Sequence, residues 1–460
     1  MATVRESFAR LPTGELWLAW DEDGAKFRRF SKGAWGEPEK KLLPGIEPGD
    51  HPTIAASAGG GPVVVLDRNG RSGTSALHVA QWQDGRWAWL GAPLLFGKEP
   101  NTHTNDVNLV VDGSGHPVVA WTEELHVKLS GLFVARWDGR AWQRLGSVPA
   151  LGPDYYLKPA LAMGPDQRVW LAWAEHQMAG PVRVVRFDGK AWEDIGGKWL
   201  TNATGGAVLQ ASLLVDTSGQ AWVAWTAEDP KTRFHVNLAR WDGKAWERVP
   251  RPAVEAEELD PKLAMGRAGP LLCSTRGPAG GRKLFCAEWS GGQWLERLAG
   301  LHVVEGVSSV GLSQVLAAED GGALLLWDEE GNGRRTRIVH AYPCAKGEVP
   351  LEPPRGVDER STWPKTVDEA ARQIAEALSQ EDRARVAKTK REDLILFHHG
   401  WGTGIRNELG LWRGNEALLR SCGKGQIVHP DDCSMVIIGA VWARLQPATP
   451  QAAPDGGSPK

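Results

Sequence analysis

The sequence predicts a mainly β protein, a seven-bladed β-propeller of four-stranded blades followed by a small all-α domain. Three observations predict it: a unit of roughly fifty residues recurs seven times, its apolar and polar residues alternate as in half-buried strands, and tryptophan is in large excess. The 460 residues include 24 Trp, 9 Phe and only 3 Tyr. Because wide, flat side chains fill the gaps between wedge-shaped sheets, a repeated blade accounts for this bias.

The repeat is clearest over residues 109–146, where LVVDGSGHPVVAWTEE is followed by LFVARWDGRAWQRLG. Weaker copies begin at Phe8, Ile54, Leu263 and Val315. The residue that ends the second strand of each copy recurs 46 to 55 residues apart, at Trp20, Leu66, Trp121, Trp173, Trp225, Ser274 and Trp327. Four strands in each copy, with no helix between copies, are typical of a β-propeller.

Two turns mark each copy. A turn such as Asp216 to Gly219 separates the first two strands, and an Asp-Gly pair supplies the positive-φ residues of a two-residue hairpin between the last two. These pairs are Asp138-Gly139, Asp188-Gly189, Asp242-Gly243 and, in weaker form, Asp84-Gly85 and Ser290-Gly291. The seventh copy is degenerate, since Tyr342-Pro-Cys344 replaces the turn and no Trp follows.

The period alone also matches kelch and WD40 repeats, but their double-Gly and paired Gly-His and Trp-Asp marks are missing from the sequence. Over residues 5–352 the repeat resembles the sialidase-like and lectin-like propeller repeats of bacterial proteins, which implies a fold and no activity. The first turn reads Asp-x-x-Gly-x-x-Trp, as from Asp216 to Trp222, whereas sialidases carry Ser-x-Asp-x-Gly-x-x-Trp.

Catalysis of glycoside hydrolysis would need two carboxylates, or a Tyr with a carboxylate, across a substrate-sized gap. The whole chain offers only Tyr155, Tyr156 and Tyr342 for the second arrangement, and no motif marks the first. We therefore assign no catalytic residue.

The loops that enter the first strands carry polar residues that differ from copy to copy, as those of an asymmetric ligand site would. Because the first strands line the central channel, these loops lie at its rim. The candidates are His51, His103, Asn105, Asp106, Tyr155, Tyr156, Lys158, Gln210, Asp260 and Lys262, with Ser313 and Gln314 in the last copy. The alternative is that they are polar because the channel is hydrated.

An acidic residue follows the second strand in five copies, at Glu22, Glu123, Glu175, Glu228 and Glu329. Such a ring would hold a cation or a basic partner, or it would cap strands and keep their edges soluble.

After Pro354 the pattern becomes helical. Thr366-Val-Asp-Glu369 is a capping box, and further helices are predicted from Ser379, around Leu394 to Phe397, from Asn415, and from Asp431 or Asp432. The expected domains are a propeller over residues 1–354, a helical domain over 355–446 and a disordered tail over 447–460.

The polar residues of the helical domain lie mostly in FHHGWGTGIRNELGLW (397–412) and HPDDCS (429–434). The candidate binding residues are His398, His399, Arg406, Asn407, Asp431 and Asp432. One of the two adjacent histidines with His429, Cys433 and an Asp would suit zinc. Alternatively, Asp431 and Asp432 cap a helix and Arg406 pairs with one of them. We assign no metal and no cofactor.

This segment resembles a small bacterial domain family of unknown function. The matching stretches are Pro364-Lys-Thr-Val, Asp393-Leu-Ile to Phe397-His398, Gly404-Ile-Arg-Asn407 to Gly410-Leu-Trp412, and His429-Pro-Asp-Asp to Ser434. The resemblance covers nearly all of residues 363–445. It implies a shared surface around Arg406 and Asn407, without an activity.

The charge, the cysteines and the amino terminus indicate which partners and which cellular compartment to expect. With 53 basic and 56 acidic residues, the chain is not expected to bind nucleic acid, and its apolar runs are too short for membrane insertion. Of five cysteines, Cys273 and Cys286 could face each other across a hairpin, but free thiols in a reducing compartment are expected. No signal peptide is visible, so the chain as written is cytoplasmic, or secreted or periplasmic if the true start lies upstream.

Together these features predict a non-catalytic binding or scaffold protein. Its propeller rim would recognise a glycan or a protein partner, and its helical domain would offer a second interaction surface. The alternative is a carbohydrate-active hydrolase of sialidase-like architecture with carboxylates at the rim, such as Asp106 or Asp260.

Overall fold

The chain forms two compact units, one over residues 3–69 and 74–357, and one over residues 358–460. The computed structural model describes residues 6–21, 25–31, 34–37, 50–57, 60–68, 75–97, 102–125, 128–148, 159–174, 181–195, 200, 207–231, 233–251, 254–278, 281–301, 307–317, 323–331, 334–342, 363–378, 380–397, 401–411 and 415–446. The predicted tail, residues 447–460, lies outside the described residues.

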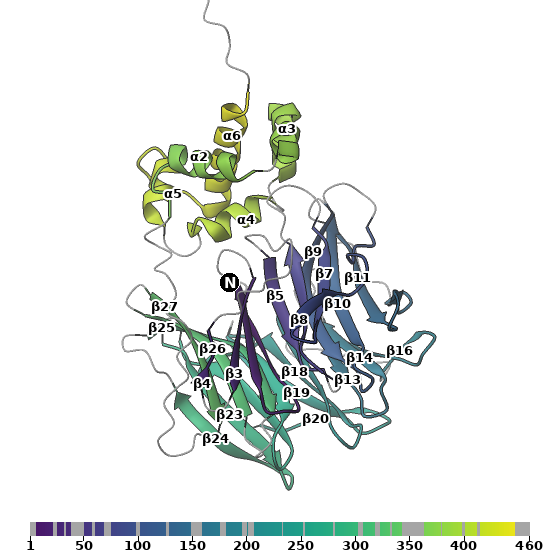
Figure 1. Cartoon of the computed structure of the whole chain (residues 1–460). Helices are drawn as coiled ribbons and strands as arrows, with labels where there is room; N and C mark the ends of the chain where they lie inside the picture. The colour runs from purple at the N-terminus through teal and green to yellow at the C-terminus, as the bar shows by residue number, and fades with distance from the viewer. Residues whose placement is uncertain are drawn as a thin grey trace, which may run out of the picture. The chain divides into compact units, whose positions relative to one another are not determined.

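The first unit is a β-propeller made of seven antiparallel sheets, each built from consecutive strands (Figure 1). The first four sheets contain β1 (Glu6–Arg10), β2 (Leu16–Asp21), β3 (Ala25–Ser31) and β4 (Ala34–Trp35); β5 (Asp50–Ala55), β6 (Val63–Arg68), β7 (Leu77–Gln83) and β8 (Arg86–Trp89); β9 (Thr102–Val111), β10 (Pro117–Leu125), β11 (Lys128–Trp137) and β12 (Trp142–Arg144); β13 (Ala160–Met163), β14 (Val169–Ala174), β15 (Val182–Phe187) and β16 (Trp192–Asp194).

The remaining sheets contain β17 (Val208–Val215), β18 (Ala221–Glu228), β19 (Phe234–Trp241) and β20 (Trp246–Arg248); β21 (Glu258–Met265), β22 (Pro270–Arg276), β23 (Lys283–Ser290) and β24 (Gln293–Leu301); β25 (Val307–Ala317), β26 (Ala323–Gly331) and β27 (Arg334–Tyr342). Six sheets therefore have four strands, and the seventh has three among the described residues. The chain that follows β27, where a fourth strand of the seventh blade would lie, is outside the described residues.

The sheets form a closed ring because each first strand packs beside the next, and β25 packs beside β1. Figure 1 shows the last sheet, in green, next to the first, in purple. Gln314 joins the two: its Oε1 accepts from the backbone N–H of Phe8 (2.9 Å), and its Nε2 donates to the Phe8 carbonyl (2.9 Å). A residue predicted to lie at the channel rim therefore closes the ring.

Three residues at the same level as Gln314 join other neighbouring blades. Each is paired in its own sheet with the residue before the recurring Trp. Ser7 Oγ donates to the Ile54 carbonyl (3.2 Å), Asn108 Nδ2 donates to the Pro159 carbonyl (2.6 Å), and Ser212 Oγ accepts from the Leu263 N–H (2.9 Å). Polar residues inside the channel thus bond adjacent first strands, which are not joined by a β-ladder.

Tryptophans on the fourth strands also form hydrogen bonds between neighbouring blades. In four consecutive blades the indole Nε1 donates to a backbone carbonyl of the preceding blade at 2.5 to 2.8 Å. The pairs are Trp142 with Leu90, Trp192 with Leu145, Trp246 with Ile195, and Trp294 with Pro250. Tryptophan therefore supplies both bulk and a specific hydrogen bond at each of these contacts.

The Asp-Gly turns differ from the prediction in three blades. Trp241 pairs with Trp246, so the loop has four residues, and among Asp242 to Ala245 only Gly243 has a positive φ (98°). The Asp242 carboxylate accepts from the N–H groups of Lys244 and Ala245, each at 2.7 Å, and these bonds hold its pKa below the ordinary value. The loops after Trp137 and Phe187 follow the same pattern.

A wider loop is favoured in those blades because the carboxylate satisfies the two N–H groups inside it. The two-residue turn is confirmed at Asp84-Gly85, where both residues have positive φ (49° and 76°). In the sixth blade the turn residues are Gly291 and Gly292, one residue later than predicted.

The second unit is helical. It contains α2 (Val367–Ala377), α3 (Gln380–Lys388), the 3-10 helix η1 (Arg391–Phe397), α4 (Trp401–Glu408), α5 (Glu416–Cys422) and α6 (Pro430–Arg444). The capping box of Thr366 and Glu369 and the Asn415 cap are confirmed. α6 begins earlier than predicted, because Pro430 suits a first helical position and His429, not Asp431 or Asp432, is the cap. In the described residues, no helix is long and apolar enough to cross a bilayer.

Two disulfides correct the expectation of free thiols. Cys273 is bonded to Cys286 on the paired strands β22 and β23 of the propeller. Cys422 is bonded to Cys433 and joins the end of α5 to α6. The spacing of the first pair across its hairpin was the only sequence signal for either bond.

Candidate functional site

The first strands run through the propeller in parallel around the channel, so the channel has two distinct ends. We call the end where the loops enter the first strands the loop end, and the end where turns lead to the second strands the turn end. His103 and Val111 lie eight residues apart in β9, which places them about 26 Å apart at about 3.3 Å per residue. The predicted rim residues all belong to the loop end.

The described candidates lie on five first strands: His51 on β5, His103, Asn105 and Asp106 on β9, Gln210 on β17, Asp260 and Lys262 on β21, and Ser313 and Gln314 on β25. Tyr155, Tyr156 and Lys158 lie outside the described residues. The repeat therefore places the described candidates at the loop end as predicted.

A β-bulge interrupts the first strand near the loop end in four blades. The pairing register shifts beside Asp106 in β9, Gln210 in β17, Asp260 in β21 and Ser313 in β25. Asp106 and Asp260 both have positive φ, at 52° and 55°, a conformation that non-glycine residues seldom adopt. Bulges redirect side chains and are frequent beside functional sites, so this layer is the candidate site.

Asp260 links two blades at this level. Gln210 Nε2 donates to Asp260 Oδ1 (2.8 Å), and Thr275 Oγ1 donates to Asp260 Oδ2 (3.2 Å). Both carboxylate oxygens are therefore engaged, which makes Asp260 a poor choice for the nucleophile of a hydrolase.

His51 belongs to a second polar group that spans three blades. Its Nδ1 lies 3.1 Å from Asp21 Oδ2 of the first blade, and His51 pairs across its own sheet with Asp67. Asp67 Oδ1 accepts from Thr104 Oγ1 of the third blade (2.6 Å), and the Thr104 N–H donates to Ser75 Oγ (2.8 Å). Asp67, Thr104 and Ser75 are buried. This group fixes His51 at the loop end.

Glu124 is a carboxyl group of the loop end that sequence reasoning missed. It pairs across β9 and β10 with His103. Its neighbour Glu123 accepts from the backbone N–H groups of Phe96 and Gly97 on the side of the second blade. Adjacent strand residues point to opposite faces, so Glu124 and His103 face the fourth blade. Burial raises the pKa of Glu124 above its ordinary value.

The acidic residues that follow the second strands act as caps wherever they are described. Glu123 also accepts from Trp121 Nε1 (2.9 Å), Glu329 accepts from Trp327 Nε1 (2.9 Å), and Glu228 accepts from the Ala207 N–H (3.2 Å). Glu22 and Glu175 lie outside the described residues. The three carboxylates therefore bond groups of the protein, as a cap would, but Glu123 and Glu329 are buried and so do not keep strand edges soluble.

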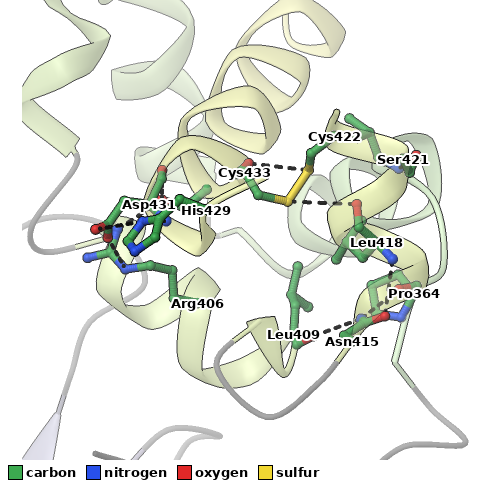
Figure 2. The surroundings of a disulfide bond; sticks show 12 residues. Pro364, Arg406, Leu409, Asn415, Leu418, Ser421, Cys422, His429, Asp431 and Cys433 are labelled. Atoms are coloured by element: carbon green, nitrogen blue, oxygen red, sulfur yellow. Dashed lines mark hydrogen bonds and ion pairs between the residues drawn. A yellow bond between two sulfur atoms is a disulfide. The ribbon is translucent and has the colours of Figure 1, made fainter. Parts of the chain in front are cut away.

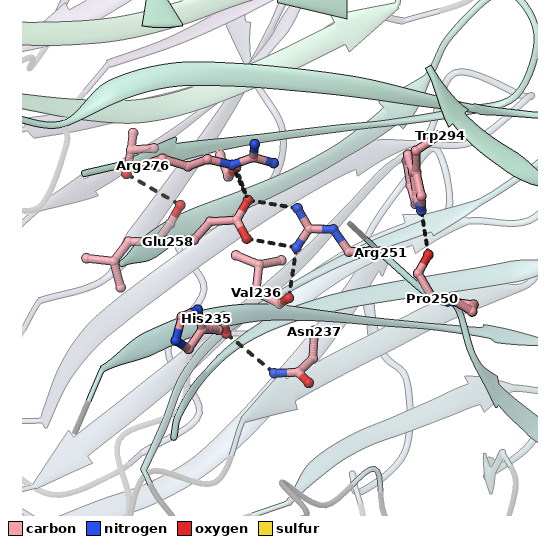
Figure 3. Close-up of polar contacts among 11 residues, drawn as sticks. His235, Val236, Asn237, Pro250, Arg251, Glu258, Arg276 and Trp294 are labelled. Atoms are coloured by element: carbon pink, nitrogen blue, oxygen red, sulfur yellow. Dashed lines mark hydrogen bonds and ion pairs between the residues drawn. The ribbon is translucent and has the colours of Figure 1, made fainter. Parts of the chain in front are cut away.

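In the sixth blade, where Ser274 stands at the position of the recurring Trp, Glu258 forms ion pairs with Arg251 and Arg276 (Figure 3). Glu258 accepts two hydrogen bonds from Arg251 (2.7 and 2.9 Å), one from Arg276 (2.9 Å) and one from Ser274 Oγ (2.6 Å). Burial opposes the charged form of Glu258, but the arginines outweigh it and hold the pKa at about 2. These contacts stabilise the blade rather than form a site.

In the helical unit, Arg406 joins α4 to the start of α6 (Figure 2). Its Nε lies 3.1 Å from Asp431 Oδ1, and its Nη1 donates to Ser434 Oγ (2.9 Å). The predicted pairing of Arg406 with an aspartate is therefore confirmed. Asp432 lies in the first turn of α6, and Asn407 is placed in α4 by its backbone alone. His398 and His399 lie outside the described residues.

The zinc interpretation loses a ligand because Cys433 is bonded to Cys422. The described residues contain no cluster of three His, Cys, Asp or Glu side chains suited to a metal ion.

Residues in and beside the stretches that carry the family resemblance also have structural roles. Asn415 Nδ2 donates to the carbonyls of Pro364 (3.0 Å) and Leu409 (2.8 Å), and Gly410 has φ 68° with the Trp363 ring against it. Figure 2 shows Asn415 with its two partners, Pro364 and Leu409.

Comparison with known proteins gives a family match for the helical unit. Residues 363–445 match the family described as a domain of unknown function, DUF6794. No curated protein shows significant similarity to the chain.

Among solved structures, a Mycobacterium tuberculosis puromycin-hydrolysing peptidase has a TM-score of 0.50 and 16% identity over 77% of this chain. The match spans 53% of the peptidase, about half its length. An ulvan lyase of polysaccharide lyase family 25 has a TM-score of 0.47 and 12% identity, covering 69% of this chain and 87% of the lyase.

A Penicillium chrysogenum α-L-arabinanase has a TM-score of 0.37 and 12% identity, covering 60% of this chain and 88% of the arabinanase. At 16% identity and a TM-score of 0.50, the likeness to the peptidase concerns the fold alone. None of the three is named a sialidase, so the sialidase-like character stays a prediction.

Proposed function

We propose that the propeller recognises a glycan at the loop end of its channel. The bulges at four first strands carry the proposal, because they direct a different polar residue in each blade: Asp106, Gln210, Asp260 and Ser313. Such side chains sit on rigid strands rather than on loops, which suits the positioning of a specific ligand. Carboxylate, amide and imidazole groups also match the donors and acceptors of sugar hydroxyls.

Binding to defined polysaccharides tests this proposal. The names of the similar lyase and arabinanase suggest ulvan and arabinan as first probes, beside a general glycan array. We expect one glycan to bind, and Asp106→Asn and His103→Gln each to weaken it about tenfold, which corresponds to one lost hydrogen bond to a charged group. Asn tolerates the positive φ of Asp106, so this variant should fold. Glu247→Gln, on an exposed outer strand, is the control. Failure of every glycan to bind would contradict the proposal.

Catalysis at the same end is the second candidate, and Glu124 is the observation that favours it. A partly buried carboxyl with a raised pKa, which lies opposite His103 in the strand register, suits the role of a general acid. If a bound glycan is cleaved, Glu124→Gln should lower the rate about a hundredfold or more while binding persists. Release of reducing or unsaturated ends measures this, and binding without release leaves the protein a non-catalytic recognition module.

The helical unit supports a second interaction surface for a protein partner. The exposed large apolar side chains among the described residues all belong to it, at Ile395, Leu396, Ile427 and Val436. Exposed apolar groups of this kind are typical of association surfaces. A Leu396→Glu variant should release a partner that co-purifies with the wild-type chain, whereas Glu416→Gln should retain it.

The two disulfides support an oxidising compartment, since such bonds are rare in reducing ones. We therefore favour the secreted or periplasmic setting over the cytoplasmic one. Thiol labelling of protein taken from its native host, with and without reductant, tests this.

A further inference from the structure

The turn end of the channel holds a hollow that none of the candidates above touches. Its volume is about 700 Å³, within the usual range for small-molecule sites. Five consecutive blades line it, each with the end of its first strand and the turn that follows. Along β9 about 26 Å separates the turn end from the loop end, so this hollow is separate from the bulged layer.

Ser57 supplies a buried polar group in the wall of the hollow. The residue is 1% exposed, and its Oγ has no hydrogen-bond partner among the described residues. A buried hydroxyl without a partner costs about 1–3 kcal/mol, so most such groups in proteins are satisfied. Ser57 also belongs to the lining of the hollow, so a ligand there is the candidate partner for this hydroxyl once the atoms that cover Oγ move aside.

The other polar groups of the wall are held in place by their own turns. Asp112 Oδ1 accepts from the N–H groups of Ser114 and His116, each at 2.9 Å, and its other oxygen pairs with Arg136. Across the mouth, the Gly113 N–H donates to Gln167 Oε1 (2.6 Å), which joins the turns of the third and fourth blades. Hydrogen bonds and an ion pair within the protein therefore hold these polar side chains of the wall in place before any ligand binds.

Asp216 repeats this arrangement in the fifth blade. Its Oδ1 accepts from the N–H groups of Ser218 and Gln220, each at 2.9 Å, and its Oδ2 accepts from Trp222 Nε1 (3.0 Å). The two carboxylates are thus compensated, and the Arg10 guanidinium stands with them in the same lining. A wall with one cation and two compensated anions favours neither a strongly anionic nor a strongly cationic ligand.

We propose that this hollow is a second binding site, which takes a small neutral polyhydroxylated ligand such as a disaccharide. Its hydroxyl, carboxylate and guanidinium groups match sugar hydroxyls, and the apolar surfaces of Pro12, Met163 and Pro165 match the C–H faces of sugar rings. The site is independent of the glycan site at the loop end, so one can be occupied while the other is empty.

Maltose, cellobiose and xylobiose serve as probes for the full-length protein, with inorganic phosphate as the anionic comparison. Saturation-transfer NMR reports binding, and amide hydrogen exchange reports where it occurs. We expect at least one disaccharide to bind and to protect the turns at residues 111–117 and 215–221, while phosphate does not. Protection of the loop-end strands alone, or no binding by any of the three, would overturn the proposal.

Ser57→Ala and Arg10→Met should each weaken disaccharide binding at least fivefold. Ser31→Ala, at the exposed end of β3 and outside the lining, should leave it unchanged. Ser57→Ala removes an unpartnered hydroxyl, so its melting temperature should equal or exceed that of the wild type. Unchanged binding by a folded Ser57→Ala variant would also overturn the proposal, whatever happens to glycan binding at the loop end.

Discussion

At the residue scale, the exception to the tryptophan pattern in the sixth blade has a physical reason. Ser274 stands at the Trp position, and its hydroxyl donates to Glu258, which two arginines also contact. The sequence shows the missing Trp but not its replacement, because Arg251 and Arg276 lie on opposite sides of Glu258 in the chain and meet it only in the folded sheet. For the same reason, the sequence could not predict that Asp260 accepts hydrogen bonds from Gln210 and Thr275, or that Glu124 is partly buried.

The Glu258 network predicts a pH dependence of stability. The pKa of Glu258 falls from 4.5 to about 2 on folding, so its charge stabilises the fold above pH 4.5, and this contribution is lost as the pH drops toward 2. The contribution is about 3 kcal/mol, from about 1.4 kcal/mol for each pKa unit. Urea unfolding at pH 7 and pH 3 measures it: Glu258→Gln should destabilise the protein far more at pH 7 than at pH 3.

Glu247→Gln is the matched control, since Glu247 pairs with Arg240 at an exposed position and should show little effect at either pH. An equal loss of stability at both pH values for Glu258→Gln would indicate a packing defect and contradict the electrostatic role.

At the element scale, the sequence predicts strands well and the contacts between sheets poorly. The period of the Trp residues places the second strands, yet it does not show that fourth-strand indoles donate to the preceding blade or that Ser7, Asn108 and Ser212 bond adjacent first strands. These bonds depend on the distance between sheets, which strand periodicity does not contain. In the helical unit, the capping residues Thr366 and Asn415 predict the starts of α2 and α5. The sequence does not predict α4, because its two glycines are poor helix formers.

The fourth-strand Trp hydrogen bonds can be measured with a Trp→Phe pair. Trp246 Nε1 donates to the Ile195 carbonyl (2.8 Å), whereas the buried Nε1 of Trp35 has no partner among the described residues. Both substitutions lose similar ring area, so their difference isolates the hydrogen bond. Trp246→Phe should destabilise the propeller about 1 kcal/mol more than Trp35→Phe in chemical unfolding. Equal losses would show that these indoles contribute bulk alone.

At the scale of the whole molecule, each unit has its own core and its own disulfide. The helical core runs from Ala370 to Val441, and the propeller cores hold no residue of that segment. The sequence predicts this division because the Trp-rich repeat stops before the first capping box. It could not predict that both units are cross-linked, since cysteine spacing alone is compatible with free thiols.

Separate cores predict separate unfolding transitions, each sensitive to one disulfide. Cys273 and Cys286 are 13 residues apart and Cys422 and Cys433 are 11 apart, so each bond should stabilise its unit by about 3 kcal/mol through the unfolded chain. The double variant Cys422→Ser/Cys433→Ser should lower the transition of the helical unit and leave that of the propeller unchanged, and Cys273→Ser/Cys286→Ser should do the reverse. Calorimetry in the presence and absence of reductant measures both. If either variant shifted both transitions equally, the two units would unfold as one cooperative body.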